Sequence, residues 1–137
     1  MNDTAGQSIP EKNKEIVRFS WNAIFNKLEL AICDEVIAPD YTFNGQAPGG
    51  SAAESVKEFA KSVHAAYPDV VFDILDVLGD GDKVAIRYTV TGTHSGTAQL
   101  METMATNILT MVDGRCTANW QTGGTMHGID HLQATGH

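Results

Sequence analysis

His94 is the side chain in this sequence that is best suited to proton transfer. It follows a β-rich run, residues 83–93, and stands in the segment Gly92-Thr93-His94-Ser95-Gly96. Histidine titrates close to neutral pH, which suits general acid–base catalysis. The competing interpretation is a histidine that holds the end of the strand by a hydrogen bond. We therefore take His94 as the candidate catalytic residue and keep that structural role as the alternative.

Three amide side chains, those of Asn107, Asn119 and Gln121, form the second group that could carry chemistry. Their positions alternate so that they share one face of a predicted sheet. Amides on one face can hold a carbonyl or hydroxyl group, or stabilise a developing oxyanion. The alternative is a structural network that these amides satisfy among themselves and with water. Because unpaired buried amides are costly, we favour contact with a ligand.

The remaining polar candidates have simpler interpretations. Arg87 could bind a carboxylate, but an exposed ion pair is the more ordinary role. Strict alternation predicts that Asp73 and Asp76 lie on opposite faces of their strand, which excludes a paired-carboxylate site. His127 and His131 have the spacing of a helical metal pair, but no third ligand is evident. We therefore predict no metal site.

Charge and composition exclude several classes of function. The 9 Lys and Arg against 17 Asp and Glu give a formal charge of −8, and no basic residues cluster. Binding to nucleic acid or to an anionic membrane needs clustered positive charge, so neither is expected. Cys33 and Cys116 are too few for a disulfide framework and are predicted to be free thiols. With no apolar segment typical of a signal peptide or a membrane span, we expect a cytoplasmic protein.

The hydrophobic pattern predicts helices first and strands afterwards. Residues 1–10 read as a flexible arm, and residues 11–137 as a single domain. Helices are expected from about residue 11, over about residues 29–37, and after the capping box that Ser51 and Glu54 form. From residue 70 the period changes to two, and Asp113-Gly114 marks a hairpin. This α+β order predicts a curved antiparallel sheet around the first helix, with a ligand pocket between them.

The order and spacing of several short motifs resemble a known family. The motifs cover most of residues 13–122 and include Trp21-Asn22, Ala38-Pro39-Asp40-Tyr41, Tyr67-Pro68-Asp69, Gly92-Thr93-His94-Ser95-Gly96, Asp113-Gly114-Arg115 and Asn119-Trp120. Together they resemble the SnoaL-like polyketide cyclases, a branch of the NTF2-like superfamily. The resemblance implies a cone-shaped α+β barrel with three N-terminal helices packed on the sheet.

The resemblance also implies a place for the chemistry. In that family an acid–base carboxylate follows the Asp-Gly hairpin, a His and a Gln lie on the preceding strand, and neither metal nor organic cofactor takes part. Counted from Asp113-Gly114, these three positions fall on Gln121, Asn107 and Ala105. The expected pocket is lined by Asn107, Asn119, Gln121, Leu109, Trp21, Phe25, Tyr41 and Asn44.

The resemblance leaves alternatives for function. The first is a cofactor-independent cyclase, isomerase or dehydratase that acts on a small apolar or polyketide-like substrate and uses His94. The second is a non-catalytic ligand-binding or accessory protein, because Gln121 replaces the acid–base carboxylate. The third is a dimerisation module whose own side chains fill the pocket. A homodimer is expected through the outer face of the sheet, with Trp120 in the interface.

Overall fold

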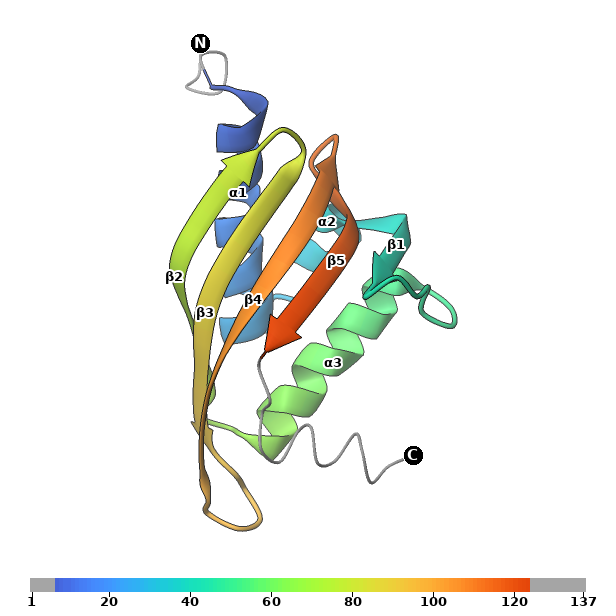
Figure 1. The fold of residues 1–137 in the computed structure, drawn as a ribbon. Coiled ribbons are helices and arrows are strands. Elements are labelled where there is room, and N and C mark those ends of the chain that lie inside the picture. The colour runs from blue at the N-terminus through green and yellow to red at the C-terminus, as the bar shows by residue number, and fades with distance from the viewer. Residues whose placement is uncertain (1–6, 124–137) are drawn as a thin grey trace.

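The computed structural model describes residues 7–123, which fold as helices followed by a sheet (Figure 1). The helices are α1 (Ile9–Trp21), the π-helix η2 (Asn22–Asn26), α2 (Ile32–Val36) and α3 (Ala52–Ala66). The strands are β1 (Ile37–Phe43), β2 (Val71–Asp80), β3 (Lys83–Thr93), β4 (Leu100–Val112) and β5 (Arg115–Gly123). The α+β prediction is confirmed. Helix α1 begins inside the predicted arm, of which residues 1–6 lie outside the described part.

The strands form one curved sheet with the order β1-β5-β4-β3-β2. The pairs β2–β3, β3–β4 and β4–β5 are antiparallel, whereas β1 pairs with β5 in parallel. The expectation of a purely antiparallel sheet is therefore wrong at this edge. Strand β1 is followed by helix α3 and not by a hairpin turn, and the crossover that a parallel pair needs is supplied in this way.

Local turn and cap chemistry matches the sequence prediction. Asp113 and Gly114 have φ values of 51° and 80°, which is the left-handed pair that a tight hairpin requires. Helix α3 begins where predicted, with the Ser51 hydroxyl accepting a hydrogen bond from the Glu54 backbone N–H at 3.2 Å. These local signals fix the turn between β4 and β5 and the start of α3, whereas the β4–β5 register shifts farther along, between Thr110 and Met111.

A bulge in β2 changes the predicted placement of two acidic residues. The register shifts between Ile74 and Asp76, so that Asp73 pairs with Thr89 and Asp76 pairs with Arg87. Both partners alternate with buried β3 residues, so both carboxylates lie on the outer face of the sheet. The predicted placement on opposite faces is wrong, because an inserted residue breaks the alternation on which it rested.

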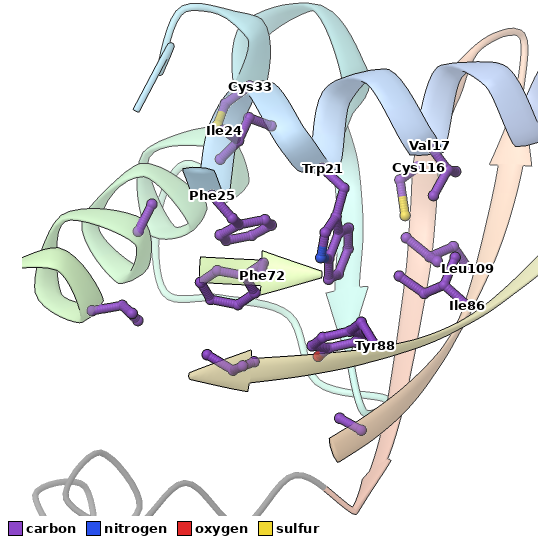
Figure 2. Packing of buried hydrophobic residues seen from close by; sticks show 14 of the residues in the cluster. Val17, Trp21, Ile24, Phe25, Cys33, Phe72, Ile86, Tyr88, Leu109 and Cys116 are labelled. Carbon is purple, nitrogen blue, oxygen red and sulfur yellow. The ribbon is translucent and has the colours of Figure 1, made fainter. Parts of the chain in front are cut away.

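The core lies between the concave face of the sheet and helix α1 with its π-helical continuation. Trp21 packs against Phe25 and Tyr88 with ring-centre distances of 4.8 and 5.4 Å, and Phe25 packs against Phe72 at 5.2 Å. Figure 2 shows these rings stacked between the helix and the strands. All the helices cover the same face of the sheet (Figure 1). The other face of the sheet carries exposed apolar side chains, among them Met104, Ile108 and Trp120.

The π-helix turns the chain so that the consecutive residues Ile24 and Phe25 are both buried. It is anchored by Asn26, whose side-chain amide donates to the Phe72 carbonyl at 2.9 Å and accepts from the Phe72 N–H at 2.8 Å. His64 on α3 contacts the Phe25 carbonyl through Nε2 at 2.7 Å. A wide turn of this kind is often found at functional sites, and here it places Ile24 and Phe25 beside a cavity.

Candidate functional site

A cavity of about 600 Å³ lies between the concave face of the sheet, helix α1 with η2, and helix α3. Most of its wall is apolar and comes from Val17, Trp21, Ile24, Phe25, Val56, Phe59, Phe72, Leu109 and Met111. Polar side chains gather on the strands and at the opening, where Asn44, Gln46 and Ser55 are exposed. A cavity of this size is typical of small-molecule sites.

The structure brings the predicted pocket residues together around this cavity. Asn107, Asn119, Gln121, Leu109, Trp21, Phe25, Tyr41 and Asn44 all line it. They come from α1, η2, β1, β4, β5 and the segment after β1, so the fold gathers residues that are distant in sequence. Asn107 and Gln121, the two positions at which the resemblance expects a histidine and a carboxylate, are direct cross-strand partners.

Four buried side chains form a continuous chain of hydrogen bonds across the sheet. The Tyr88 hydroxyl donates to Asn107 Oδ1 at 2.9 Å, and Asn107 Nδ2 donates to Asn119 Oδ1 at 2.7 Å. Asn119 Nδ2 then donates to the Tyr41 hydroxyl oxygen at 3.2 Å. The chain therefore crosses from β3 through β4 and β5 to β1. It satisfies both buried asparagines, which would otherwise destabilise the fold.

Burial keeps the cavity's titratable groups protonated. It raises the pKa of Tyr41 to about 12, although the hydrogen bond from Asn119 acts in the opposite direction. It also raises the pKa of the Cys116 thiol to about 12 and shifts the pKa of Tyr88 upward. Within residues 7–123 no carboxylate, imidazole or amine lines the cavity. The described wall can therefore donate hydrogen bonds at neutral pH, but it holds no ordinary general base.

Tyr88 and the indole nitrogen of Trp21 are site features that the sequence analysis did not single out. Trp21 is buried, and its Nε1 has no hydrogen-bond partner among the described residues. Tyr88 could have been found from its alternation with Val84 and Ile86, which face the core. Its place at the start of the hydrogen-bond chain depends on the pairing of β3 with β4 and could not be found locally.

His94 lies outside the cavity lining, in the turn that follows β3. Its Nδ1 accepts hydrogen bonds from the backbone N–H groups of Gly96 and Thr97 at 3.1 and 3.2 Å. Its ring meets the edge of Tyr67 at a centre distance of 5.4 Å. These contacts match the structural role that was kept as the alternative. The catalytic role of His94 stays a prediction.

Hydrogen bonds attach the segment beside the opening of the cavity to strand β5. The Asn44 side-chain oxygen accepts from the Gln121 backbone N–H at 2.8 Å, and the Asn44 N–H donates to the Asn119 carbonyl at 2.9 Å. Asn44 has a φ of 50°, and the next residue, Gly45, has a φ of 83°. This tight turn packs Gly45 against the Trp120 ring, so the segment beside the opening also contacts the outer face of the sheet.

The other sequence candidates have structural roles or fall outside the described residues. Arg87 forms the expected surface ion pair, with Asp76 at 2.6 Å. Cys33 and Cys116 are buried free thiols, as predicted. Residues 7–123 contain no cluster of three or more potential metal ligands, and the pair His127 and His131 lies beyond them. No helix in the same range is long and apolar enough to cross a membrane.

Comparison with known proteins gives a consistent result for family and fold. The family model described as SnoaL-like polyketide cyclase matches residues 15–127. A provisionally assigned polyketide cyclase from Acidithiobacillus ferrooxidans is 26% identical, with 93% of this chain and 99% of that chain covered and a TM-score of 0.73. IdmH from Streptomyces antibioticus, also provisionally assigned as a polyketide cyclase, is 25% identical, with 93% and 99% covered and a TM-score of 0.67.

A third solved structure supports the fold alone. AclR from Streptomyces galilaeus, provisionally assigned as a hydroxylase, is 23% identical, with 91% of this chain and 83% of that chain covered and a TM-score of 0.72. No curated protein matches the chain in sequence.

Proposed function

This chain belongs to the SnoaL-like polyketide cyclase family, and we propose that it binds a small, mainly apolar molecule in the cavity between α1 and the sheet. One observation carries the proposal. The cavity of about 600 Å³ has a mainly aromatic and aliphatic wall, with a row of hydrogen-bonding side chains on the strands and a few further polar side chains, such as Ser20 and Ser55, on the helices. Such a cavity removes apolar surface from water while a few polar groups fix the orientation of the ligand.

The same observation favours binding over acid–base catalysis by the described wall. Gln121 occupies the position that the family resemblance assigns to the carboxylate, and an amide does not accept a proton at neutral pH. Tyr41 and Cys116 are protonated at neutral pH even at their ordinary pKa values, and burial raises each pKa further, to about 12. We therefore place the non-catalytic, ligand-binding function first.

A thermal-shift titration with small aromatic and isoprenoid ketones, esters and hydrocarbons tests this proposal. A ligand at about 100 times its Kd adds about 2.7 kcal/mol of stability, a shift of several degrees for a domain of this size. Leu109→Trp fills the cavity and should abolish the shift. Leu78→Trp places the same side chain at an exposed position of β2 and serves as the matched control, because Leu78 is 69% exposed. A shift that survives Leu109→Trp but not Leu78→Trp would contradict the proposal.

Family membership supports a second candidate, a cofactor-independent cyclase or isomerase. The specific observation in its favour is that the Tyr41 hydroxyl and the asparagines could stabilise an enolate oxygen formed from a bound carbonyl. This candidate predicts faster exchange of the protons next to the carbonyl of 1-tetralone in D2O. Loss of that exchange in His94→Gln would assign the base to His94. If the protein does not accelerate this exchange at concentrations where 1-tetralone binds, the result favours a binding function without catalysis.

A homodimer through the outer face of the sheet fits the exposed side chains there. Ile108 and Trp120 are cross-strand partners and are 45% and 52% exposed. Together with Met104, which lies four residues before Ile108 on the same strand, they give the outer face several exposed apolar side chains, and such side chains are often found at an interface. Sedimentation of the wild type against Trp120→Lys tests this pairing. A dimer that persists in the variant would place the interface elsewhere.

A further inference from the structure

We propose that the Tyr41 hydroxyl is the anchoring donor for the ligand, and that the cavity therefore selects neutral molecules carrying a carbonyl-type acceptor. The inference rests on the proposed binding function and names the class of molecule that is bound. It follows from the direction of the hydrogen-bond chain and from the absence of charge in the described wall.

The direction of the hydrogen-bond chain follows from which group donates in each of its hydrogen bonds. Tyr88 gives its single hydroxyl hydrogen to Asn107, and each asparagine passes a hydrogen onward through its Nδ2 group. Tyr41 ends the chain as an acceptor, so its own hydroxyl hydrogen remains available. No acceptor for that hydrogen is present among residues 7–123. A chain of aligned hydrogen bonds also polarises its last hydroxyl and makes it a better donor.

The position of Tyr41 directs this hydrogen to a ligand. Tyr41 lines the cavity, and only 6% of the residue is exposed, so the partner of this hydrogen is whatever molecule occupies the cavity. Trp21 Nε1 is a second buried donor without a partner among the described residues, and Trp21 lines the same cavity. Two unsatisfied donors in an otherwise apolar space favour a ligand that brings oxygen acceptors.

The charge of the wall limits the ligand further. No Lys, Arg or His within residues 7–123 lines the cavity, so a carboxylate would be buried without a cation. An ammonium group would likewise lack a carboxylate partner. A neutral ketone or ester loses little hydration free energy when it leaves water, and its carbonyl oxygen can accept a hydrogen bond from the Tyr41 hydroxyl. The cavity should therefore prefer neutral acceptors both to hydrocarbons and to charged molecules of the same size.

Two shape-matched probes test the inference: 1-tetralone, which carries a ketone, and tetralin, which lacks it. Calorimetry on the wild type should give a Kd for 1-tetralone about tenfold lower than that for tetralin, the ratio expected for one net hydrogen bond. Tyr41→Phe should bring this ratio to about one. Tyr67→Phe removes a hydroxyl from a buried residue outside the cavity and should leave the ratio unchanged.

A third variant tests the direction of the chain. In Tyr88→Phe the asparagines still connect to Tyr41, so a ketone preference of at least threefold should persist. If Tyr88→Phe loses the ketone preference completely while Tyr41→Phe retains it, the hydrogen-bond chain runs in the opposite direction. That result would overturn the assignment of Tyr41 as the anchoring donor. Tighter binding of 1-naphthoate than of 1-tetralone would overturn the neutral class.

The outcomes also separate this inference from the proposed function. If tetralin and 1-tetralone bind the wild type equally, the cavity binds apolar molecules, and the role of Tyr41 is refuted. If neither probe binds, both proposals fail. Far-ultraviolet circular dichroism and the melting temperature of each variant establish that the fold is retained before any ratio is compared.

Discussion

Removing the amide of Asn107 should destabilise the protein strongly, because this side chain joins two neighbours that have no other partner for the same atoms within residues 7–123. Asn107 is 1% exposed, donates to Asn119 and accepts from the Tyr88 hydroxyl. In Asn107→Ala the Tyr88 hydrogen and Asn119 Oδ1 both lose their partners. An unsatisfied buried polar group costs about 1–3 kcal/mol, which gives about 2–6 kcal/mol for the pair.

We expect a loss of about 3 kcal/mol, towards the lower end, because the adjacent cavity can admit solvent to the exposed atoms. At about 4 °C per kcal/mol the melting temperature should fall by about 12 °C. Urea denaturation gives the free energy directly. Gln99→Ala removes an amide from an exposed turn and should stay within about 0.5 kcal/mol of the wild type. A loss below 1 kcal/mol for Asn107→Ala would refute the argument that these bonds stabilise the buried face.

Three other changes have defined outcomes. Because burial raises the pKa of Tyr41 and of Cys116 to about 12, the folded state holds these protons more tightly than the unfolded chain. The contribution of these two groups to stability should therefore be constant below about pH 8.5 and fall as the pH rises towards 12, which urea midpoints between about pH 7 and pH 12 would show. Gly45→Ala should cost about 1–3 kcal/mol, since φ is 83° and the added Cβ would lie 3.0 Å from the Trp120 ring, and an unchanged melting temperature would contradict this. Gln121→Asp combined with Asn107→His places a carboxylate and an imidazole on cross-strand partners and should create α-proton exchange of 1-tetralone that the wild type lacks.

The parts of the fold that local chemistry determines were predictable from the sequence. Alternation along residues 84–90 placed Val84, Ile86 and Tyr88 together, and these residues face the core. The Asp113-Gly114 turn fixed the last hairpin, because only residues that tolerate positive φ form it without strain. The turn alone does not place Asn107 opposite Gln121, because the β4–β5 register shifts by one residue between Thr110 and Met111, and this bulge produces the observed pairing.

The parts that depend on distant contacts were not predictable. The parallel pairing of β1 with β5 joins the first strand to the last, and no local signal specifies it. That pairing brings Tyr41 to Asn119 and so completes the hydrogen-bond chain. The bulge after Ile74 likewise reverses the expected placement of one of the two acidic residues of β2. His94 had suitable chemistry, but the turn that holds it lies away from the cavity.

The two tryptophans allow a direct measurement of where a ligand binds. Trp21 lines the cavity, whereas Trp120 is 52% exposed on the outer face of the sheet. Their indole N–H signals can be resolved in a 15N–1H spectrum and assigned with Trp120→Phe. On titration with 1-tetralone, the account predicts that the Trp21 signal moves and saturates while the Trp120 signal stays in place. Movement of the Trp120 signal alone would show that the ketone binds the outer face, and would contradict the assignment of the cavity as the binding site.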